Sequence, residues 1–330
     1  MDEIFARKNL IKPGRLHALS ARSDLAGFLQ VGSHLAAIVA SGAALWLTWG
    51  TWWAVPVFVL HGALLNFLYA GQHELSHWTP FKTRGLNAFF GRIFGFILLY
   101  PRSFDQIQHT AHHRHTQDWA LDGELARDRY TLSSYLLWFF GPTYWYSRVA
   151  RILRMSAGIV IEPYIPAERR ADVILEARLH LAGYAAIAAA SVALQSWAAV
   201  ILWLAPLVAT KCLHQLQNTI EHLGLTHEQN ILKNTRTTRT NAFLRWLCWN
   251  MQYHTAHHAF PGVPFYKLPV LHKEIFEDNG LKPYAMTYWG FQRQVWRALS
   301  GGRTEADYPA DRAWIAEPQD LPPAKVAVNA

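Results

Sequence analysis

Charged residues are scarce in this 330-residue chain. They make up 16% of the sequence, against about a quarter in an average soluble protein, while apolar residues make up 51%. This scarcity argues against a purely cytosolic protein. A mean hydropathy close to zero argues equally against a chain made only of membrane-spanning helices. The composition therefore predicts a membrane part and a polar part of comparable size.

Cysteine is also scarce, and clustered basic residues are missing. Cys212 and Cys248 are the only two cysteines, which excludes a disulfide framework and favours a reducing compartment. Lys and Arg outnumber Asp and Glu by 31 to 23, but they are scattered and form no nucleic-acid-binding motif. We therefore expect no nucleic-acid partner, and we expect a basic surface that faces anionic lipid or an acidic protein. The polar N-terminus is unlike a cleaved signal peptide.

The first long stretch without charge runs from Leu25 to His73. A membrane span needs about 20 apolar residues, so this stretch has room for two helices and a tight turn. We expect spans near residues 25–47 and 52–70. The turn between them is rich in tryptophan, as is typical of a membrane interface; its tryptophans are Trp46, Trp49, Trp52 and Trp53.

A second uncharged stretch runs from Leu179 to Thr210 and is short for two complete spans. Flanking charged residues can extend helix ends into the headgroup region, which gives spans near 174–194 and 197–216 with a turn at Gln195 and Ser196. A single tilted helix followed by a buried segment is the alternative, and hydropathy does not distinguish the two.

The distribution of basic residues indicates the orientation of these spans. Neither proposed turn contains Lys or Arg, so the positive-inside rule places both termini and the central segment in the cytoplasm. Two aromatic stretches, 86–100 and 130–146, are too short to span and predict helices at the interface or packed beneath the cytoplasmic part. Residues 311–330, rich in Pro and Ala, predict a loose tail.

Histidine is unusually abundant, with 17 residues, and nine of them fall into four short patterns. The patterns are His73-Glu-Leu-Ser-His77, His109-Thr-Ala-His112-His113, Asn218-Thr-Ile-Glu-His222 and His254-Thr-Ala-His257-His258. On a helix, residues three or four apart share one face, so each pattern points its imidazoles toward a common region. Neutral imidazole binds iron, zinc and copper. These patterns predict a metal site.

The number of histidines exceeds what one ion needs, because a catalytic zinc takes three protein ligands and a structural zinc four. Nine histidines suit two adjacent ions. Paired cysteines are missing, which argues against an iron–sulfur cluster. We expect iron, although the spacing alone does not separate it from other metals that bind imidazole. The histidines can meet on one side of the membrane only if the second uncharged stretch crosses it twice.

These motifs resemble those of the integral-membrane fatty acid desaturase superfamily. Its HxxxH, HxxHH and HxxHH boxes match the three histidine-rich patterns in order, and residues 249–265, WNMQYHTAHHAFPGVPF, are similar to the surroundings of its third box. Asn218 and His222 resemble an additional Asn-x-x-x-His element, in which the Asn acts on the metal through a water and the His binds it. The resemblance covers roughly Leu25 to Lys273, so we expect a single domain over residues 1–330.

The resemblance implies an all-α membrane protein with four transmembrane helices in two hairpins. A cytoplasmic helical cap, from residues 72–173 and 217–310, would hold two iron ions. Reduced iron activates O₂, and hydrogen is removed from a C–H bond of an acyl chain, which gives a double bond. The superfamily also contains lipid and carotenoid hydroxylases and ketolases, which the boxes do not distinguish.

The resemblance also implies partners. The substrate is an acyl-lipid or acyl-thioester in a lipid membrane, and O₂ is the oxidant. No haem-binding cytochrome domain is visible in the sequence, so electrons would come from a separate ferredoxin, cytochrome b5 or flavin reductase type of donor. The sequence does not identify the substrate or the donor.

Carboxylates are expected behind the histidines, because a metal-bound His normally donates its other N–H to an acceptor. The candidates near the boxes are Glu74, Asp105, Asp118, Asp122 and Glu221. Each of them is equally compatible with a solvated or helix-capping role.

Two other functions fit parts of the pattern. His73 to His77 reads HExxH, the motif of zinc metalloproteases, with Glu74 as general base; this interpretation leaves seven patterned histidines unexplained. A metal transporter with a histidine relay is the other alternative. Transport sites are expected near the middle of the bilayer, whereas these histidines lie in charged segments.

Overall fold

The computed structural model describes residues 10–125 and 127–317. The protein is mostly helical. Within the described residues its strands are β1 (Thr237–Thr238) and β2 (Ala285–Met286), a parallel pair in which Thr237 lies opposite Ala285. The all-α class expected from the sequence is therefore confirmed.

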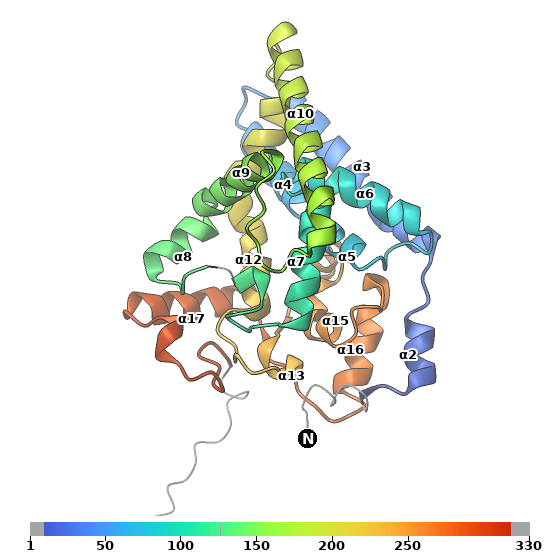
Figure 1. Cartoon of the computed structure of the whole chain (residues 1–330), viewed down its shortest axis with the longest axis vertical. Helices are drawn as coiled ribbons and strands as arrows, with labels where there is room; N and C mark the ends of the chain where they lie inside the picture. The colour runs from blue at the N-terminus through green and yellow to red at the C-terminus, as the bar shows by residue number, and fades with distance from the viewer. Residues whose placement is uncertain (1–9, 126, 318–330) are drawn as a thin grey trace, which may run out of the picture.

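Three helices are long and apolar enough to cross a membrane. They are α3 (Asp24–Thr48), the stretch Ala54–Ser76 formed by α4 (Ala54–Asn66) and α5 (Leu68–Ser76), and the stretch Ala167–Ala193 formed by η3 (Ala167–Arg169) and α10 (Arg170–Ala193). They coincide with three of the four expected spans. In Figure 1 they occupy the narrow upper part of the molecule, where α10 reaches the tip.

The expected span at 197–216 is an interrupted helix. It consists of a π-helical segment η4 (Val200–Leu204), α11 (Ala205–Ala209) and, after Thr210, α12 (Lys211–His222). Proline is the physical reason, because Pro206 has no N–H to donate to the carbonyl of Leu202. His61 of α4 donates to that carbonyl instead, with Nε2 at 2.8 Å.

At the second interruption, Thr210, a side chain of α4 again supplies hydrogen bonds to the interrupted segment. Asn66 Nδ2 donates to the carbonyl of Leu207 at 2.9 Å and to Thr210 Oγ1 at 3.1 Å. Unpaired backbone groups are costly at membrane depth. The polar residues of α4 thus allow this segment to deviate from a regular helix while packing against α4.

Of the remaining helices, α6 and α9 flank α4 and α10 in Figure 1, and the others form the broader part below them. The expected helix at 86–100 is α6, and the stretch 130–146 divides into α8 and α9, separated by Gly141 in a left-handed conformation (φ 105°). The bounds are α2 (Pro13–Leu19), α6 (Arg84–Ile97), α7 (Arg102–Arg114), η2 (Gly123–Leu125), α8 (Leu132–Phe139), α9 (Pro142–Ser156), α13 (Ile231–Asn234), α14 (Ala242–Leu247), η5 (Met251–Tyr253), α15 (His254–Ala259), η6 (Phe265–Lys267), α16 (Leu268–Phe276), α17 (Tyr288–Ser300) and η7 (Glu305–Asp307).

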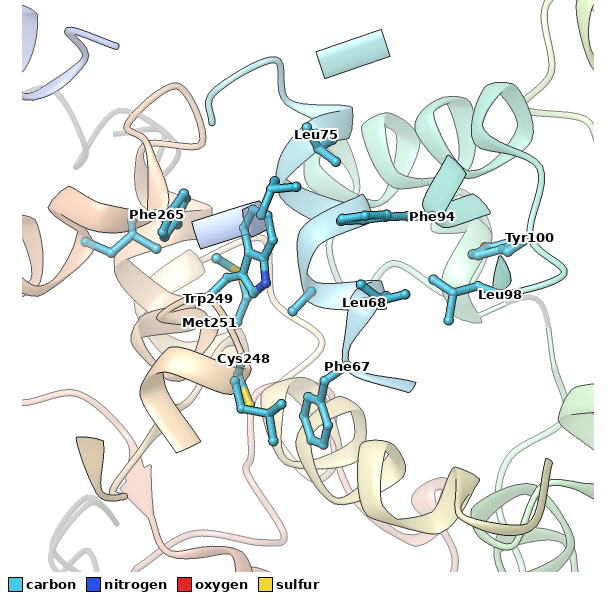
Figure 2. Packing of buried hydrophobic residues seen from close by; sticks show 14 of the residues in the cluster. Phe67, Leu68, Leu75, Phe94, Leu98, Tyr100, Cys248, Trp249, Met251 and Phe265 are labelled. Carbon is cyan, nitrogen blue, oxygen red and sulfur yellow. The ribbon is translucent and has the colours of Figure 1, made fainter. Parts of the chain in front are cut away.

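A fully buried tryptophan joins the first and third histidine boxes. Trp249 lies between Phe94 and Leu75 on one side and Phe265 on the other (Figure 2). Gly71, two residues before the first box, permits this contact, because a Cβ there would come within 2.7 Å of both the Trp249 and the Phe94 rings. The packing fixes α5 against the segment that leads into α15.

The expected loose tail begins later than the sequence suggested. Ile315 is fully buried, and the backbone N–H groups of Trp314 and Ile315 both donate to the carbonyl of Gly224. Arg236 holds the same region, because its guanidinium donates to the carbonyls of Ile220, Leu223 and Ile315. Residues 310–317, which we name the C-terminal segment, therefore pack behind the end of α12. The rest of the expected tail, 318–330, lies outside the described residues.

Candidate metal centre

The nine patterned histidines gather in two adjacent groups. Within each group the possible ligand nitrogens all lie within 4.8 Å of one another. The five-histidine group contains His73, His77, His109, His113 and His257, and the four-histidine group contains His112, His222, His254 and His258. The rings come from α5 and its C-cap, α7, α12 and α15.

Helical spacing explains how the histidines divide. Residues four apart enter the same group, as His109 and His113 do on α7. The third histidine of that box, His112, enters the other group. On α15 the pair of histidines four apart, His254 and His258, belongs to the four-histidine group, and His257 belongs to the five-histidine group. Each HxxHH box therefore contributes to both groups.

The distances between nitrogens suit metal ligands. His109 Nε2 lies 2.8 Å from His77 Nε2 and 2.9 Å from His113 Nε2 in the five-histidine group. In the four-histidine group, His222 Nε2 lies 2.8 Å from His254 Nε2 and 3.1 Å from that of His112. Two imidazoles bound at right angles about 2.1 Å from one ion would stand about 3 Å apart. The ring nitrogens thus converge as ligands of one ion do.

Two unpaired nitrogens point to the same conclusion. The Nε2 atoms of His73 and His258 are buried and have no hydrogen-bond partner within the described part of the chain. A buried polar atom without a partner is costly and requires an explanation. A metal ion in each group would provide the missing partner.

Several ring Nδ1 atoms face acceptors, which leaves Nε2 for a metal. His112 Nδ1 lies 2.9 Å from Asp122 Oδ2, and His109 Nδ1 lies 3.1 Å from Glu124 Oε1. His222 Nδ1 lies 3.0 Å from the carbonyl of Asn234. Such acceptors fix the orientation of a ligating ring and make it more basic.

Two carboxylates expected from the sequence also approach histidines. Glu74 Oε1 lies 3.3 Å from His257 Nδ1 and 3.8 Å from His73 Nδ1. Glu221 Oε1 lies 3.4 Å from His254 Nδ1. Both side chains are buried, and each stands behind an imidazole ring on its Nδ1 side, where an acceptor for a ligating histidine is expected.

The other two expected carboxylates have different partners. Asp118 accepts hydrogen bonds from the backbone N–H groups of Ala120 and Leu121, so its role is to stabilise a turn. Asp105 is buried beside α5 and accepts from Ser76 Oγ at 3.2 Å. Neither makes a hydrogen bond to a box histidine in the described structure. The sequence did not point to Glu124, because it reaches His109 from η2, 15 residues further along the chain.

Burial favours the neutral, metal-binding form of most of these imidazoles. It lowers the pKa of His77 and that of His222 to about 3 each, and neighbouring imidazoles add to the effect. His112 is the exception. Burial lowers its pKa, but Asp122 and Glu124 outweigh burial and raise it to about 9. A metal ion would therefore have to displace a proton from His112.

Asn218 lies one helical turn before His222 on α12. It lines a small pocket of about 90 Å³ that contains His112 and His222, and it also lines a larger cavity of about 750 Å³. Asn218 thus lies between the four-histidine group and the larger cavity.

Comparison with known proteins gives a consistent result. The family model described as fatty acid desaturase matches residues 50–292, which include all nine histidines. The chain is 25% identical over 244 residues to a fatty acid desaturase of Bacillus subtilis (strain 168), covering 65% of this chain and 66% of that protein. It is 28% identical over 241 residues to the sphingolipid delta(4)-desaturase/C4-monooxygenase DES2 of Rattus norvegicus, covering 69% and 68%. The chain thus matches about two thirds of the length of each relative.

Proposed function

Because the chain belongs to the fatty acid desaturase family, we propose that it is a membrane-bound di-iron enzyme that uses O₂ to introduce a double bond into a fatty acyl chain. The observation that carries this proposal is the convergence of nine histidines into adjacent groups of five and four. The family generally uses iron, and imidazole is a suitable ligand for it.

The described residues support a division of roles around such a centre. Iron held by the two groups would supply the activation of O₂ needed to remove hydrogen from an unactivated C–H bond. The five-histidine group leaves little room for further ligands. The four-histidine group has Asn218 beside it, and we assign Asn218 a contact with the metal through water. Glu74, Asp122, Glu124 and Glu221 orient the rings and balance the charge of the ions.

We further propose four spans in two hairpins, with both termini in the cytoplasm and a single domain over the chain. Three apolar helices and residues 200–216 of the interrupted segment supply the spans. The cytoplasmic cap would comprise residues 72–173 and 217–310. Support comes from the positions of the histidines, since His73 and His77 lie at the C-terminal end of the second segment and His222 follows the fourth.

The proposed partners follow from the family. The substrate is an acyl-lipid or acyl-thioester, O₂ is the oxidant, and a separate ferredoxin, cytochrome b5 or flavin reductase type of protein donates electrons. Hydroxylation is the second candidate reaction, because the name of the rat relative includes monooxygenase as well as desaturase. A lipid or carotenoid hydroxylase or ketolase would use the same histidines.

The metalloprotease alternative has less support. Glu74 would have to act as a general base on water, but its side chain is fully buried and one of its two carboxylate oxygens already accepts two hydrogen bonds. Oε2 accepts from Thr79 Oγ1 at 2.9 Å and from the Phe265 N–H at 3.1 Å, and Oε1 faces His257. A transporter is also less well supported, because the histidines lie at the ends of the apolar helices.

The test combines metal content with lipid analysis. The protein is expressed in a host with and without O₂, and we expect new unsaturated or hydroxylated lipids only with O₂. The purified protein should contain two iron ions per chain. One zinc ion and no iron would overturn the proposal in favour of the protease, and metal transport into vesicles without O₂-dependent products would favour a transporter.

Single histidine variants test the site itself. Replacement of His73, His109, His113, His254 or His258 by Ala should abolish turnover and lower iron content while leaving membrane insertion intact. His115→Ala is the matched control, because His115 follows α7 directly and belongs to neither group. Near-normal turnover in several of the five variants would refute the assignment.

A further inference from the structure

A cavity of about 750 Å³ lies next to the four-histidine group. It is bounded by α8, α9 and α12 and by the turn at Tyr100. Glu124 and Asn218 line both this cavity and the small pocket that contains His112 and His222. A molecule in the cavity would therefore lie beside the candidate metal centre. Its volume is in the range of ligand-binding cavities.

Most cations around this cavity have acidic partners. Arg127 forms two hydrogen bonds to the Glu305 carboxylate, at 2.9 and 3.0 Å. Arg154 pairs with Glu162, and Arg151 Nε lies 3.5 Å from the same carboxylate. Each of these three guanidinium groups thus has a carboxylate within ion-pair distance, although Arg151 and Arg154 share that of Glu162.

Arg148 differs from these arginines. It lines the cavity, and its guanidinium lies 3.3 Å from the centre of the Tyr100 ring and 4.5 Å from that of Tyr144. In the described structure no carboxylate lies within ion-pair distance of it, and its Nε is buried without a hydrogen-bond partner. Aromatic rings stabilise a cation only partly. Arg148 therefore brings to the cavity wall a positive charge that has no direct ion pair among the described residues.

Lys211 adds a second positive charge behind the same wall. It is 1% exposed, and its Nζ lies 3.9 Å from the centre of the Tyr144 ring and 3.0 Å from His214 Nδ1. Within the described residues it too has no acidic partner. Burial raises the pKa of Tyr144, but Arg148 and Lys211 outweigh burial and lower it to about 8. The part of the wall around Tyr144 therefore carries positive charge from Arg148 and Lys211.

Arg148 is partly buried, and a charge removed from water without an acidic partner is costly. An anion entering the cavity would remove this cost at Arg148, and an arginine recognises carboxylate and phosphate with two parallel hydrogen bonds. The rings of Tyr69, Tyr100 and Tyr144 provide apolar surface beside the charge.

We propose that this cavity binds the anionic group of the substrate, a carboxylate or a phosphate, with Arg148 as its direct ligand and Lys211 as a supporting charge. The inference rests on the proposed function, because it takes the substrate to be an acyl compound. It adds that the charged end of the substrate enters the protein beside the four-histidine group and does not remain at the membrane surface.

The test is equilibrium binding to the purified, iron-loaded protein in a non-ionic detergent, without O₂ or an electron donor, so that no turnover occurs. One arm compares palmitate with hexadecanol, which has the same chain and no charge. The other compares phosphatidic acid with the diacylglycerol of the same chains. We expect one anionic compound to bind roughly tenfold more tightly than its neutral counterpart, the size of a charge-assisted interaction. The arm that shows this preference identifies carboxylate or phosphate.

Variants assign the preference to its residues. Arg148→Gln should abolish the preference while leaving binding of the neutral compound and iron content unchanged, and Arg148→Lys should retain part of it. Lys211→Met should reduce it less than Arg148→Gln does. Arg154→Gln is the matched control: it removes the same group from the same helix and cavity, but that arginine is paired with Glu162. It should keep the full preference.

Three results would overturn the proposal. The first is that the unaltered protein binds charged and neutral compounds equally or binds neither. The second is that Arg148→Gln keeps the full preference for the anionic compound. The third is that Arg154→Gln loses as much of this preference as Arg148→Gln does. The outcome is separable from that of the proposed function. A protein that lacks O₂-dependent products but keeps an Arg148-dependent anion preference would refute the enzyme assignment and support the anion site.

Discussion

The carboxylate of Glu74 contacts both histidine boxes that frame the five-histidine group. Its Oε1 faces His257, and its Oε2 accepts hydrogen bonds from Thr79 and from the Phe265 N–H. One residue thus links α5 to the segment after α15. A neutral amide of the same shape cannot accept at both ends, because it has only one acceptor oxygen.

Glu74→Gln should therefore weaken iron binding about 10- to 100-fold, the usual effect of losing an acceptor behind a ligating His. The measurement is competition for iron against a chelator of known affinity. Asp118→Asn is the control, because Asp118 contacts only backbone N–H groups of its turn. Equal loss of iron in both variants would contradict the assigned role of Glu74.

The sequence indicated the histidines but not all of their partners. The i, i+3 and i, i+4 spacing on helices was enough to predict that the nine rings face a common region. It could not predict the division into five and four, which depends on how α7 and α15 face each other. Glu124 and Arg148 were not predicted either. Glu124 reaches His109 through a short 3₁₀ turn. Arg148 stands out because no carboxylate lies within ion-pair distance of it in the described structure, and a sequence does not show which charged side chains are paired.

Among the helices, the segment after α10 departs most from expectation. Its apolar sequence predicts a span near 197–216, yet Pro206 and Thr210 interrupt it. Hydropathy measures length and polarity and is insensitive to such interruptions. The compensating residues, His61 and Asn66, lie in α4, about 140 positions earlier, so no local pattern could reveal them.

His61→Leu should destabilise the protein by about 1–3 kcal/mol, because it leaves the Leu202 carbonyl without a donor. The measurement is the free energy of unfolding in mixed detergent micelles. Adding Pro206→Ala should recover part of the loss, because alanine returns a backbone N–H to the helix. A double variant no more stable than His61→Leu would show that the hydrogen bond is not the cause.

The end of α12 depends on Arg236 in a similar way. Its guanidinium holds two carbonyls at the end of α12 and one in the C-terminal segment. Arg236→Gln should therefore cost about 2–3 kcal/mol of unfolding free energy, as expected for buried hydrogen bonds to a charged group. It should also lower the iron bound by the four-histidine group.

Arg239→Gln is the control for this prediction. Arg239 is three residues away, and its guanidinium makes an exposed ion pair with Glu317 at 3.2 Å. We expect Arg239→Gln to change the free energy of unfolding by less than about 0.5 kcal/mol. Comparable effects of the two substitutions would contradict the special role of Arg236.

On the scale of the whole molecule, the apolar helices form one end, and α7, α12 and α15, which carry seven of the nine histidines, lie in the broader remainder. The all-α class and three of the candidate spans were predictable, because a long uncharged apolar stretch rarely forms anything other than a membrane-spanning helix. The number of crossings was not, because the last segment is interrupted. The two-hairpin arrangement remains a proposal that labelling can test.

In a protein with Cys212 and Cys248 replaced by Ser, we expect Thr51→Cys and Ser196→Cys to react with a membrane-impermeant maleimide on intact cells, because both residues lie in the proposed outer turns. Arg129→Cys, an exposed position in the proposed cap, should react only after lysis. Reaction of Ser196→Cys only after lysis would instead favour a single tilted helix followed by a buried segment.

The contact of Trp314 and Ile315 with Gly224 has a consequence for biosynthesis. These bonds lie behind the end of α12, yet they join the middle of the chain to almost its last described residues. A ribosome must therefore translate the chain at least as far as Ile315 before this support can form. A premature stop codon between positions 273 and 313 would leave a nascent chain that carries all nine box histidines but lacks the C-terminal segment that packs behind the end of α12.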